Sequence, residues 1–278
     1  MLVPANALAA AAPTAPNATV PRNSRREGSF DEDSVGDMRI SVAGRIAVPR
    51  YPVSMPAAPT LATASHTAAR RQWRLCLLLT RALCRHPWEV VLARAIEGGV
   101  DAVQVREKSL GGRELVAHAR AVRALCAPFG VAVIVNDRLD VALASGADGV
   151  HLGTDDLPLR DARRIAGDDF RIGASTHSLE EARAAIDAGA DHCGVGAMYE
   201  SSLKPGLAPS GEAYLRAFVA AFPGVPHLAI GGIAPGRVAA LARAGCRGVA
   251  VSSAICGADD PAAAARAIAA ELAAGAAP

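Results

Sequence analysis

The polar side chains that could do chemistry stand at the ends of short apolar runs. In "VQVREKS" (103–109), Gln104, Arg106 and Lys108 alternate with valines. Side chains on a strand point to opposite faces in turn, so these three share one face of a predicted strand. A buried strand with a cationic face needs an anionic partner, because an unpaired buried charge is costly. The pattern therefore predicts an anion-binding edge.

Carboxylates follow the next two apolar runs of the chain. Asn136 and Asp137 end "VAVIVND", and Asp156 closes "GVHLGTDD" together with Asp155. Carboxylates at neighbouring strand ends suit Mg²⁺, which takes one or two of them and completes its shell with water and phosphate oxygens. Alternatively, Asp137 caps the helix that follows it, and either Asp155 or Asp156 caps the next helix, because a carboxylate accepts from the free N–H groups of a helix start. The sequence leaves both hypotheses open.

Glycines and serines end the last two apolar runs. "IGGI" contains Gly231 and Gly232, and "VSSAI" contains Ser252 and Ser253. Glycines let backbone N–H groups approach an anion, and the N-terminus of the helix expected to follow "IGGI" would add partial positive charge. A phosphate site is predicted there. Lys108 and Lys204 could bind a second anion, so the charges suggest two phosphorylated ligands.

The elements that must position these residues alternate regularly from Arg74 onward. Apolar runs typical of strands alternate with Ala/Arg/Glu-rich stretches that have helical periodicity. Eight such units in about 200 residues predict a (β/α)8 TIM barrel, with an open doubly wound sheet as the alternative. The expected strands are 74–80, 101–107, 131–136, 149–152, 171–175, 192–197, 227–231 and 248–253, and the expected helices are 87–98, 111–127, 138–146, 158–166, 178–189, 210–221, 235–245 and 260–274. Ser178 with Glu181 predicts a capping box, and Pro158, Pro235 and Pro261 lie where a first-turn proline belongs. In such a barrel the active site forms at the carboxyl ends of the strands.

Composition separates the chain into two regions and excludes several classes of function. Residues 1–70 are rich in Ala and Pro without lasting periodicity, which predicts a disordered extension before a catalytic domain at 71–278. A translation start nearer Met55 is an alternative. A net charge of +2 gives no basis for binding nucleic acid, and no apolar run is long enough to span a membrane. Six scattered cysteines predict free thiols in a cytoplasmic protein.

Taken together, the motifs resemble the thiamine phosphate synthase family. The resemblance rests on "VQVREKS", "VNDRLDVALASGADGVHLGTDDL", "GAST" before His177, "GVGAMY" with a later Leu-Lys, and "AIGGI" with "AGCRGVAVSSAI", in this order over 75–272. It implies a transferase that joins 4-amino-2-methyl-5-hydroxymethylpyrimidine diphosphate to a plain or carboxylated hydroxyethylthiazole phosphate and releases pyrophosphate. The implied partners are these small molecules, and a homo-oligomer is compatible with the fold.

The resemblance also implies a role for each matching residue. The implied mechanism is dissociative: pyrophosphate leaves, and the thiazole nitrogen captures a pyrimidine-methyl cation. The residues implied to bind the pyrimidine diphosphate are Gln104, Arg106, Lys108, Asn136, Ser175 and Lys204, of which Arg106, Lys108, Ser175 and Lys204 are the implied catalytic ones. Asp137 and Asp156 would hold Mg²⁺, the implied cofactor. Ser201, Gly232, Ser252 and Ser253 would contact the thiazole phosphate.

One loop departs from the family pattern and keeps two other functions open. The family carries two threonines in this loop, whereas residues 199–204 read Tyr-Glu-Ser-Ser-Leu-Lys, which keeps a hydroxyl at Ser201 and loses one at Leu203. The loop resembles that of the thiazole tautomerase relatives as much, in which a histidine at the place of His177 is the implied acid/base. A tautomerase binds no diphosphate, so Asp137 and Asp156 favour the synthase. A non-catalytic phosphate-binding barrel is the third hypothesis.

Overall fold

The computed structural model describes residues 72–200 and 209–275. The predicted disordered extension 1–70 lies outside these ranges, and the boundary at residues 70 and 71 stays a prediction. Ser201 and Lys204, two of the expected binding residues, also lie outside them. No helix in the described part of the chain is long and apolar enough to cross a membrane.

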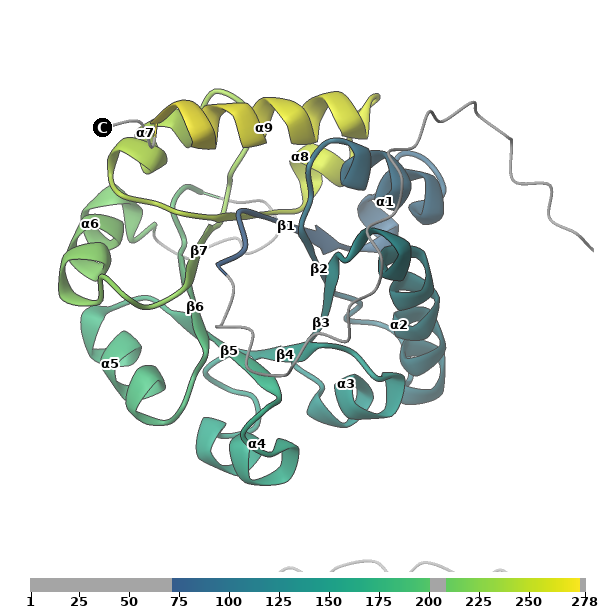
Figure 1. Cartoon of the computed structure of the whole chain (residues 1–278), viewed down its shortest axis with the longest axis horizontal. Helices are drawn as coiled ribbons and strands as arrows, with labels where there is room; N and C mark the ends of the chain where they lie inside the picture. Colours follow the sequence, from purple (N-terminus) through teal and green to yellow (C-terminus); the bar gives the residue numbers. More distant parts are fainter. Residues whose placement is uncertain (1–71, 201–208, 276–278) are drawn as a thin grey trace, which may run out of the picture. The chain divides into compact units, whose positions relative to one another are not determined.

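Eight parallel strands close into a barrel, which confirms the predicted TIM-barrel fold (Figure 1). Consecutive strands pair with one another, and the last pairs with the first through Leu75 and Val249. The strands are β1 (Leu75–Leu79), β2 (Ala102–Val105), β3 (Ala132–Asn136), β4 (Gly149–Leu152), β5 (Arg171–Thr176), β6 (His192–Gly196), β7 (His227–Ile230) and β8 (Val249–Val251). The ring brings all strand ends that carry candidate site residues to one rim.

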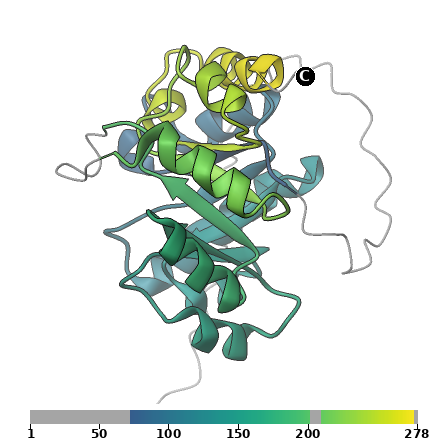
Figure 2. The ribbon, with the colours of Figure 1, turned by 90° about the vertical axis from the view of Figure 1, so that its left-hand side faces the viewer.

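Helices surround the strands, as the views along and across the barrel show (Figures 1 and 2). They are α1 (Trp88–Glu97), α2 (Gly112–Cys126), α3 (Leu139–Ser145), α4 (Leu159–Ala166), α5 (Leu179–Asp187), α6 (Gly211–Ala221), α7 (Val238–Arg243), α8 (Ser253–Cys256) and α9 (Pro261–Gly275). Short 3-10 turns lie at Arg81–Leu83 and Ala127–Phe129. The short helix α8 was not predicted, because the expected strand 248–253 covered its first residue.

The start of α7 was predicted three residues too early. Pro235 was expected in the first helical turn, but the next residue, Gly236, has a φ of 86°. A right-handed helix requires negative φ, so the helix begins only at Val238. Pro158 was expected in the first turn of α4 and instead occupies its N-cap position. Pro261 is the first residue of α9, as predicted.

Alternation along the strands divides the barrel into an outer layer and an interior. Val103 and Val105 belong to the large apolar cluster between strands and helices. A separate interior cluster contains Leu78, Ile134 and Leu228. Gln104 lies between the two valines on the opposite face and is 5% exposed, so it points into the interior. The barrel interior therefore mixes apolar and polar side chains.

Aspartates join neighbouring strands at the amino end of the barrel. Asp101, directly before β2, accepts from the backbone N–H of Leu75 in β1 at 3.1 Å. Asp148, before β4, accepts from Val133 in β3 at 2.7 Å, and Asp191, before β6, accepts from Ile172 in β5 at 2.7 Å. Each carboxylate satisfies an N–H group at a strand start that the ladder leaves open.

The fourth strand pair, β7 and β8, has no such aspartate and is held differently. Arg247 stands before β8 in place of an aspartate. The backbone N–H of His227, the first residue of β7, donates instead to the side-chain oxygen of Gln72 at 3.0 Å. The amide nitrogen of Gln72 donates to the His227 carbonyl at 2.8 Å. Gln72 precedes β1, so this bond lies at the seam where the ring closes.

Candidate functional site

Cationic and carboxylate side chains meet where β2, β3 and β4 end. The Lys108 ammonium lies 2.5 Å from Oδ2 of Asp137. Asp156 accepts from the backbone N–H of Gly153 at 2.7 Å, which fixes its carboxylate beside the same rim. Asp137 is held by its own N–H, which donates to the His151 carbonyl at 2.8 Å. Asp137 has a φ of 64°, a left-handed conformation that Asp tolerates better than most residues.

Neither aspartate caps a helix, so that alternative was wrong. The N-cap residue of α3 is Arg138 and that of α4 is Pro158, and no side-chain bond caps either helix. Burial raises the pKa of Asp156, and the adjacent Asp137 raises it further through a side-chain hydrogen bond and charge repulsion. The Lys108 ammonium lowers it. The carboxylates of Asp137 and Asp156 therefore lie close to each other.

The crowded carboxylate pair is a suitable donor set for a hard divalent cation. Two anionic oxygen donors repel each other and share a single neighbouring ammonium. The described residues contain no cluster of three or more His, Cys, Asp or Glu side chains that could enclose a metal. A site with two carboxylates and open positions fits Mg²⁺, which keeps several waters and takes phosphate oxygens.

Arg106 extends the cationic edge beyond the end of β2. Its N–H donates to the Leu79 carbonyl at 2.9 Å, and its own carbonyl accepts from Thr80 Oγ1 at 2.9 Å. The backbone is fixed, while no described residue pairs with the half-buried guanidinium. The next residue, Glu107, faces the helices and accepts from the Arg81 N–H at 2.6 Å, as expected for the valine face. The charge of Arg106 is therefore available to an anion.

A glycine turn after β7 is held by residues on both sides. The Gly231 carbonyl accepts from the Tyr199 N–H at 3.1 Å, and the Gly232 carbonyl accepts from Arg237 Nη1 at 3.0 Å. The Tyr199 hydroxyl donates to the Arg237 carbonyl at 3.0 Å, and the Arg237 guanidinium lies 5.1 Å from the Tyr199 ring centre. A Cβ on Gly232 would come within 2.5 Å of the Glu200 carbonyl, so only glycine fits.

The held carbonyls leave backbone donors free in the same turn. In a trans peptide the N–H points away from the C=O. With the Gly231 and Gly232 carbonyls engaged, the N–H groups of Gly232 and Ile233 point the other way, and neither donates to any described residue. Ile233 as a whole residue is only 6% exposed. Two adjacent free donors make a concave site for an anion.

The helix start that was expected to add positive charge to the phosphate site already holds a protein carboxylate. The start of α7 is occupied by Glu271 of α9, whose carboxylate accepts from Gly236 N–H at 2.6 Å and Val238 N–H at 3.0 Å. A protein carboxylate thus already fills the expected anion position. The other nearby helix start is α8, where Ser253 is exposed. Ser252 is buried and donates its hydroxyl proton to the Leu78 carbonyl at 2.9 Å.

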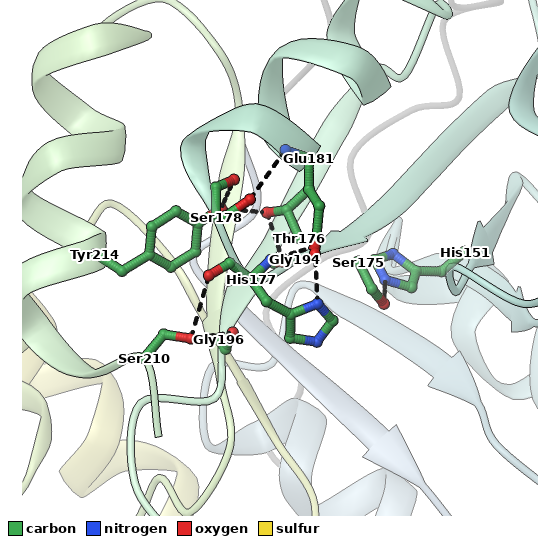
Figure 3. A network of polar contacts seen from close by, with 10 residues as sticks. All are labelled: His151, Ser175, Thr176, His177, Ser178, Glu181, Gly194, Gly196, Ser210 and Tyr214. Carbon is green, nitrogen blue, oxygen red and sulfur yellow. Dashed lines mark hydrogen bonds and ion pairs between the residues drawn. The ribbon is translucent and has the colours of Figure 1, made fainter. Parts of the chain in front are cut away.

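Ser175 and His177 lie on a braced part of the rim (Figure 3). Tyr214 donates to Thr176 Oγ1 at 2.8 Å, and Ser210 donates to the carbonyls of Gly196 and His177 at 3.2 and 3.3 Å. These bonds tie α6 to the ends of β5 and β6. Ser175 directly precedes Thr176 of this brace, and its Oγ lies 3.1 Å from His151 Nε2.

The predicted capping box at Ser178 is present in part. The Glu181 N–H donates to the Ser178 hydroxyl at 3.1 Å, as expected. The Glu181 carboxylate does not return to the Ser178 N–H. It accepts from the backbone N–H of His177 at 2.8 Å and lies 2.9 Å from the same residue's ring Nδ1 (Figure 3). His177 therefore has a structural partner on its own helix.

The structure brings most predicted site residues to one rim and adds others. Asn136 pairs with His151 in the register of β3 and β4, so both lie inside the barrel with Gln104. Tyr199, Arg237 and Glu271 were not predicted. Their bonds join residues 5 to 38 positions apart, and no local spacing motif marks them.

Comparisons with known proteins agree with this geometry. The family profile described as "Thiamine monophosphate synthase" matches residues 75–255. The "Thiamine biosynthesis bifunctional protein ThiM/ThiE" of Symbiobacterium thermophilum is 49% identical over 179 residues, which are 64% of this chain and 37% of that protein. The "Thiamine-phosphate synthase" of Chloroflexus aurantiacus is 44% identical over 196 residues, covering 70% and 90%. The solved thiamine phosphate pyrophosphorylase from Pyrococcus furiosus has a TM-score of 0.68 and 34% identity, covering 74% of this chain and 98% of that one.

Proposed function

Because the chain belongs to the thiamine monophosphate synthase family, we propose that it is a thiamine phosphate synthase. It is a transferase that joins the pyrimidine diphosphate to the thiazole phosphate and releases pyrophosphate. The observation that carries this proposal is that two anion sites of different chemistry share one rim. One is the Lys108, Asp137 and Asp156 group, and the other is the free N–H pair of the glycine turn.

The cationic edge would hold the diphosphate and stabilise it as it leaves. Arg106 and Lys108 place positive charge where the leaving group gains negative charge, which lowers the barrier to breaking the carbon–oxygen bond. Gln104 and Asn136 would orient the pyrimidine from inside the barrel. A Mg²⁺ ion held by Asp137 and Asp156 would supply further positive charge to the phosphate oxygens. The bond to the thiazole nitrogen then forms at the methylene carbon that lost pyrophosphate.

The glycine turn would hold the thiazole phosphate by its backbone donors. Gly232 and Ile233 offer two N–H groups to one anion, and the exposed Ser253 adds a hydroxyl and the start of α8. Because Ser252 gives its proton to Leu78, its hydroxyl oxygen can only accept while that bond lasts. The roles expected for Ser201 and Lys204 stay predictions.

The alternative as a thiazole tautomerase has less support. A tautomerase has no diphosphate to bind and no use for a crowded carboxylate pair beside Lys108. A non-catalytic barrel would have no reason to keep that pair either. Six free thiols, five of them buried, support the proposed cytoplasmic location. The homo-oligomer stays a prediction.

The test is a coupled assay on the purified full-length chain. Both substrates with Mg²⁺ should give thiamine phosphate and pyrophosphate in equal amounts, and either substrate alone should give neither. Chelating the metal should stop the reaction. Formation of no thiamine phosphate would overturn the synthase. Isomerisation of carboxythiazole phosphate without the pyrimidine substrate would establish the tautomerase instead.

We expect the Arg237→Ala variant to weaken binding of the thiazole phosphate. Without the guanidinium, the Gly232 carbonyl loses its partner and the Ile233 N–H is no longer held toward the anion. Losing one such bond costs about 1 kcal/mol, so KM for the thiazole phosphate should rise about fivefold while kcat changes little. Arg243→Ala, an exposed arginine at the other end of α7, is the matched control. Equal KM values in the two variants would contradict this role.

A further inference from the structure

Two imidazole rings lie in contact inside the barrel below the rim. His192, the first residue of β6, is 1% exposed, and His151 on β4 is 7% exposed. The edge of His192 meets the Trp73 ring at a centroid distance of 5.0 Å. A Cβ on Gly173 would lie 2.2 Å from the His192 ring and 2.5 Å from His151 Nδ1. The glycine therefore makes room for both rings.

The two rings and Ser175 form a chain of three groups. His192 Nε2 lies 3.4 Å from His151 Nδ1, and His151 Nε2 lies 3.1 Å from Ser175 Oγ (Figure 3 shows the second contact). Each group can donate or accept, so the chain can run in either direction. The opposite end of the hydrogen-bond chain decides between the two directions: His192 Nδ1 is buried and has no hydrogen-bond partner among the described residues.

An unpartnered nitrogen is better tolerated as a bare acceptor than as an N–H. Burial in the barrel lowers the pKa of His192 well below its ordinary value, so the ring is neutral and carries one proton. Buried N–H groups without an acceptor are rarer in proteins than under-satisfied acceptors. The proton of His192 is therefore on Nε2, where it has a partner, and Nδ1 carries the lone pair.

This assignment also fixes the proton positions of the other two groups in the hydrogen-bond chain. His192 Nε2–H donates to His151 Nδ1, so that Nδ1 must be unprotonated. The remaining proton of His151 is on Nε2 and donates to Ser175 Oγ. The hydroxyl oxygen of Ser175 then acts as an acceptor toward His151, and its own proton goes to no described residue. Ser175 is half-buried at the rim, so this proton is available to a ligand.

We propose that His192, acting through His151, fixes Ser175 as a hydrogen-bond donor to the bound substrate. His192 and His151 are positioning residues, and Ser175 makes the contact. Resting on the proposed function, this means that Ser175 binds an acceptor atom of the pyrimidine diphosphate, a ring nitrogen or a diphosphate oxygen. The exocyclic amine is a donor, so it is not the group that receives the Ser175 proton.

The direction of the three hydrogen-bonded groups can be measured on the free protein, without any substrate. Long-range ¹H–¹⁵N correlation spectra of the histidine-labelled chain distinguish protonated from bare ring nitrogens. The other histidines are replaced one at a time for assignment, so that His192 and His151 stay in the sample. A proton on Nε2 of both rings is expected at neutral pH. A proton on Nδ1 of His192, or a doubly protonated His151, overturns the proposal.

The ligand half is tested with substrate analogues and the Ser175→Ala variant. For the wild type, Kd should rise about fivefold to tenfold when the acceptor that Ser175 contacts is replaced, by carbon for a ring nitrogen or by a methylphosphonate for a terminal phosphate. In the Ser175→Ala variant, the same replacement should leave Kd unchanged. Removing the exocyclic amine should weaken both proteins equally. If amine removal alone loses its effect in the variant, the proposal is overturned. Failure of the pyrimidine diphosphate to bind at all would overturn the proposed function while the tautomers remain as assigned.

Discussion

The Asp156→Asn variant should lose thiamine phosphate formation and keep its fold. The carboxylate is proposed to hold Mg²⁺ against the leaving diphosphate, and asparagine removes the negative charge without changing the shape. Losing about 3 kcal/mol of charge stabilisation in the transition state corresponds to at least about a hundredfold in kcat/KM. The amide oxygen of asparagine can still accept from the Gly153 N–H, so the loop keeps its bond.

The stability of this variant should move in the opposite direction to its activity. The pKa of Asp156 is raised in the folded state, so the ionised carboxylate destabilises the metal-free fold at neutral pH. Asparagine removes that repulsion from Asp137, and the thermal midpoint without metal should be equal or higher. Asp155→Asn, an exposed neighbour, is the matched control. Turnover at saturating Mg²⁺ that is equal in the two variants would refute the assignment of Asp156 as a ligand.

A methyl group at position 173 should destabilise the whole barrel. In Gly173→Ala the new Cβ would lie 2.2 Å from the His192 ring and 2.5 Å from His151 Nδ1, both enclosed by the strands. Overpacking of this kind costs about 1–3 kcal/mol of the free energy of unfolding, and here two buried rings would have to move. Urea denaturation should show a lower midpoint with a similar slope.

Two further variants separate overpacking from a general effect of alanine. Gly224→Ala is the control, because a Cβ on Gly224 meets nothing within 4 Å. Removing the opposing ring in the double variant Gly173→Ala, His192→Ala should return part of the lost stability. If the double variant loses as much unfolding free energy as the two single variants lose in sum, or more, the clash with His192 is not the cause.

The sequence was enough to predict the barrel and the alternation of the residues of β2 between its two faces. Val103, Gln104 and Val105 alternate in the structure as they do in the pattern, because strand geometry imposes the period. It also supplied Asp137 and Asp156, which are 19 positions apart and crowd each other because β3 and β4 are neighbours in the ring. Nothing local distinguished a ligand from a helix cap there.

Contacts between distant elements could not be predicted from local pattern. Glu271 reaches the start of α7 from 35 positions away and fills the place expected for a phosphate. Arg237 was one arginine among many until its bond to Gly232 was known. The direction of the hydrogen-bond chain from His192 depends on a ring nitrogen with no partner in the described part of the chain, which only a packed interior can reveal.

The ties at the amino end of the barrel suggest an order of assembly. The three aspartate bonds join residues 26, 15 and 19 positions apart, so each closes a short loop at small entropic cost. The bond from Gln72 to His227 spans 155 positions and cannot form before the two ends of the domain meet. We therefore expect the three β–α–β units joined by these aspartates to form before the contact between Gln72 and His227, and closure of the ring to be the slowest folding event.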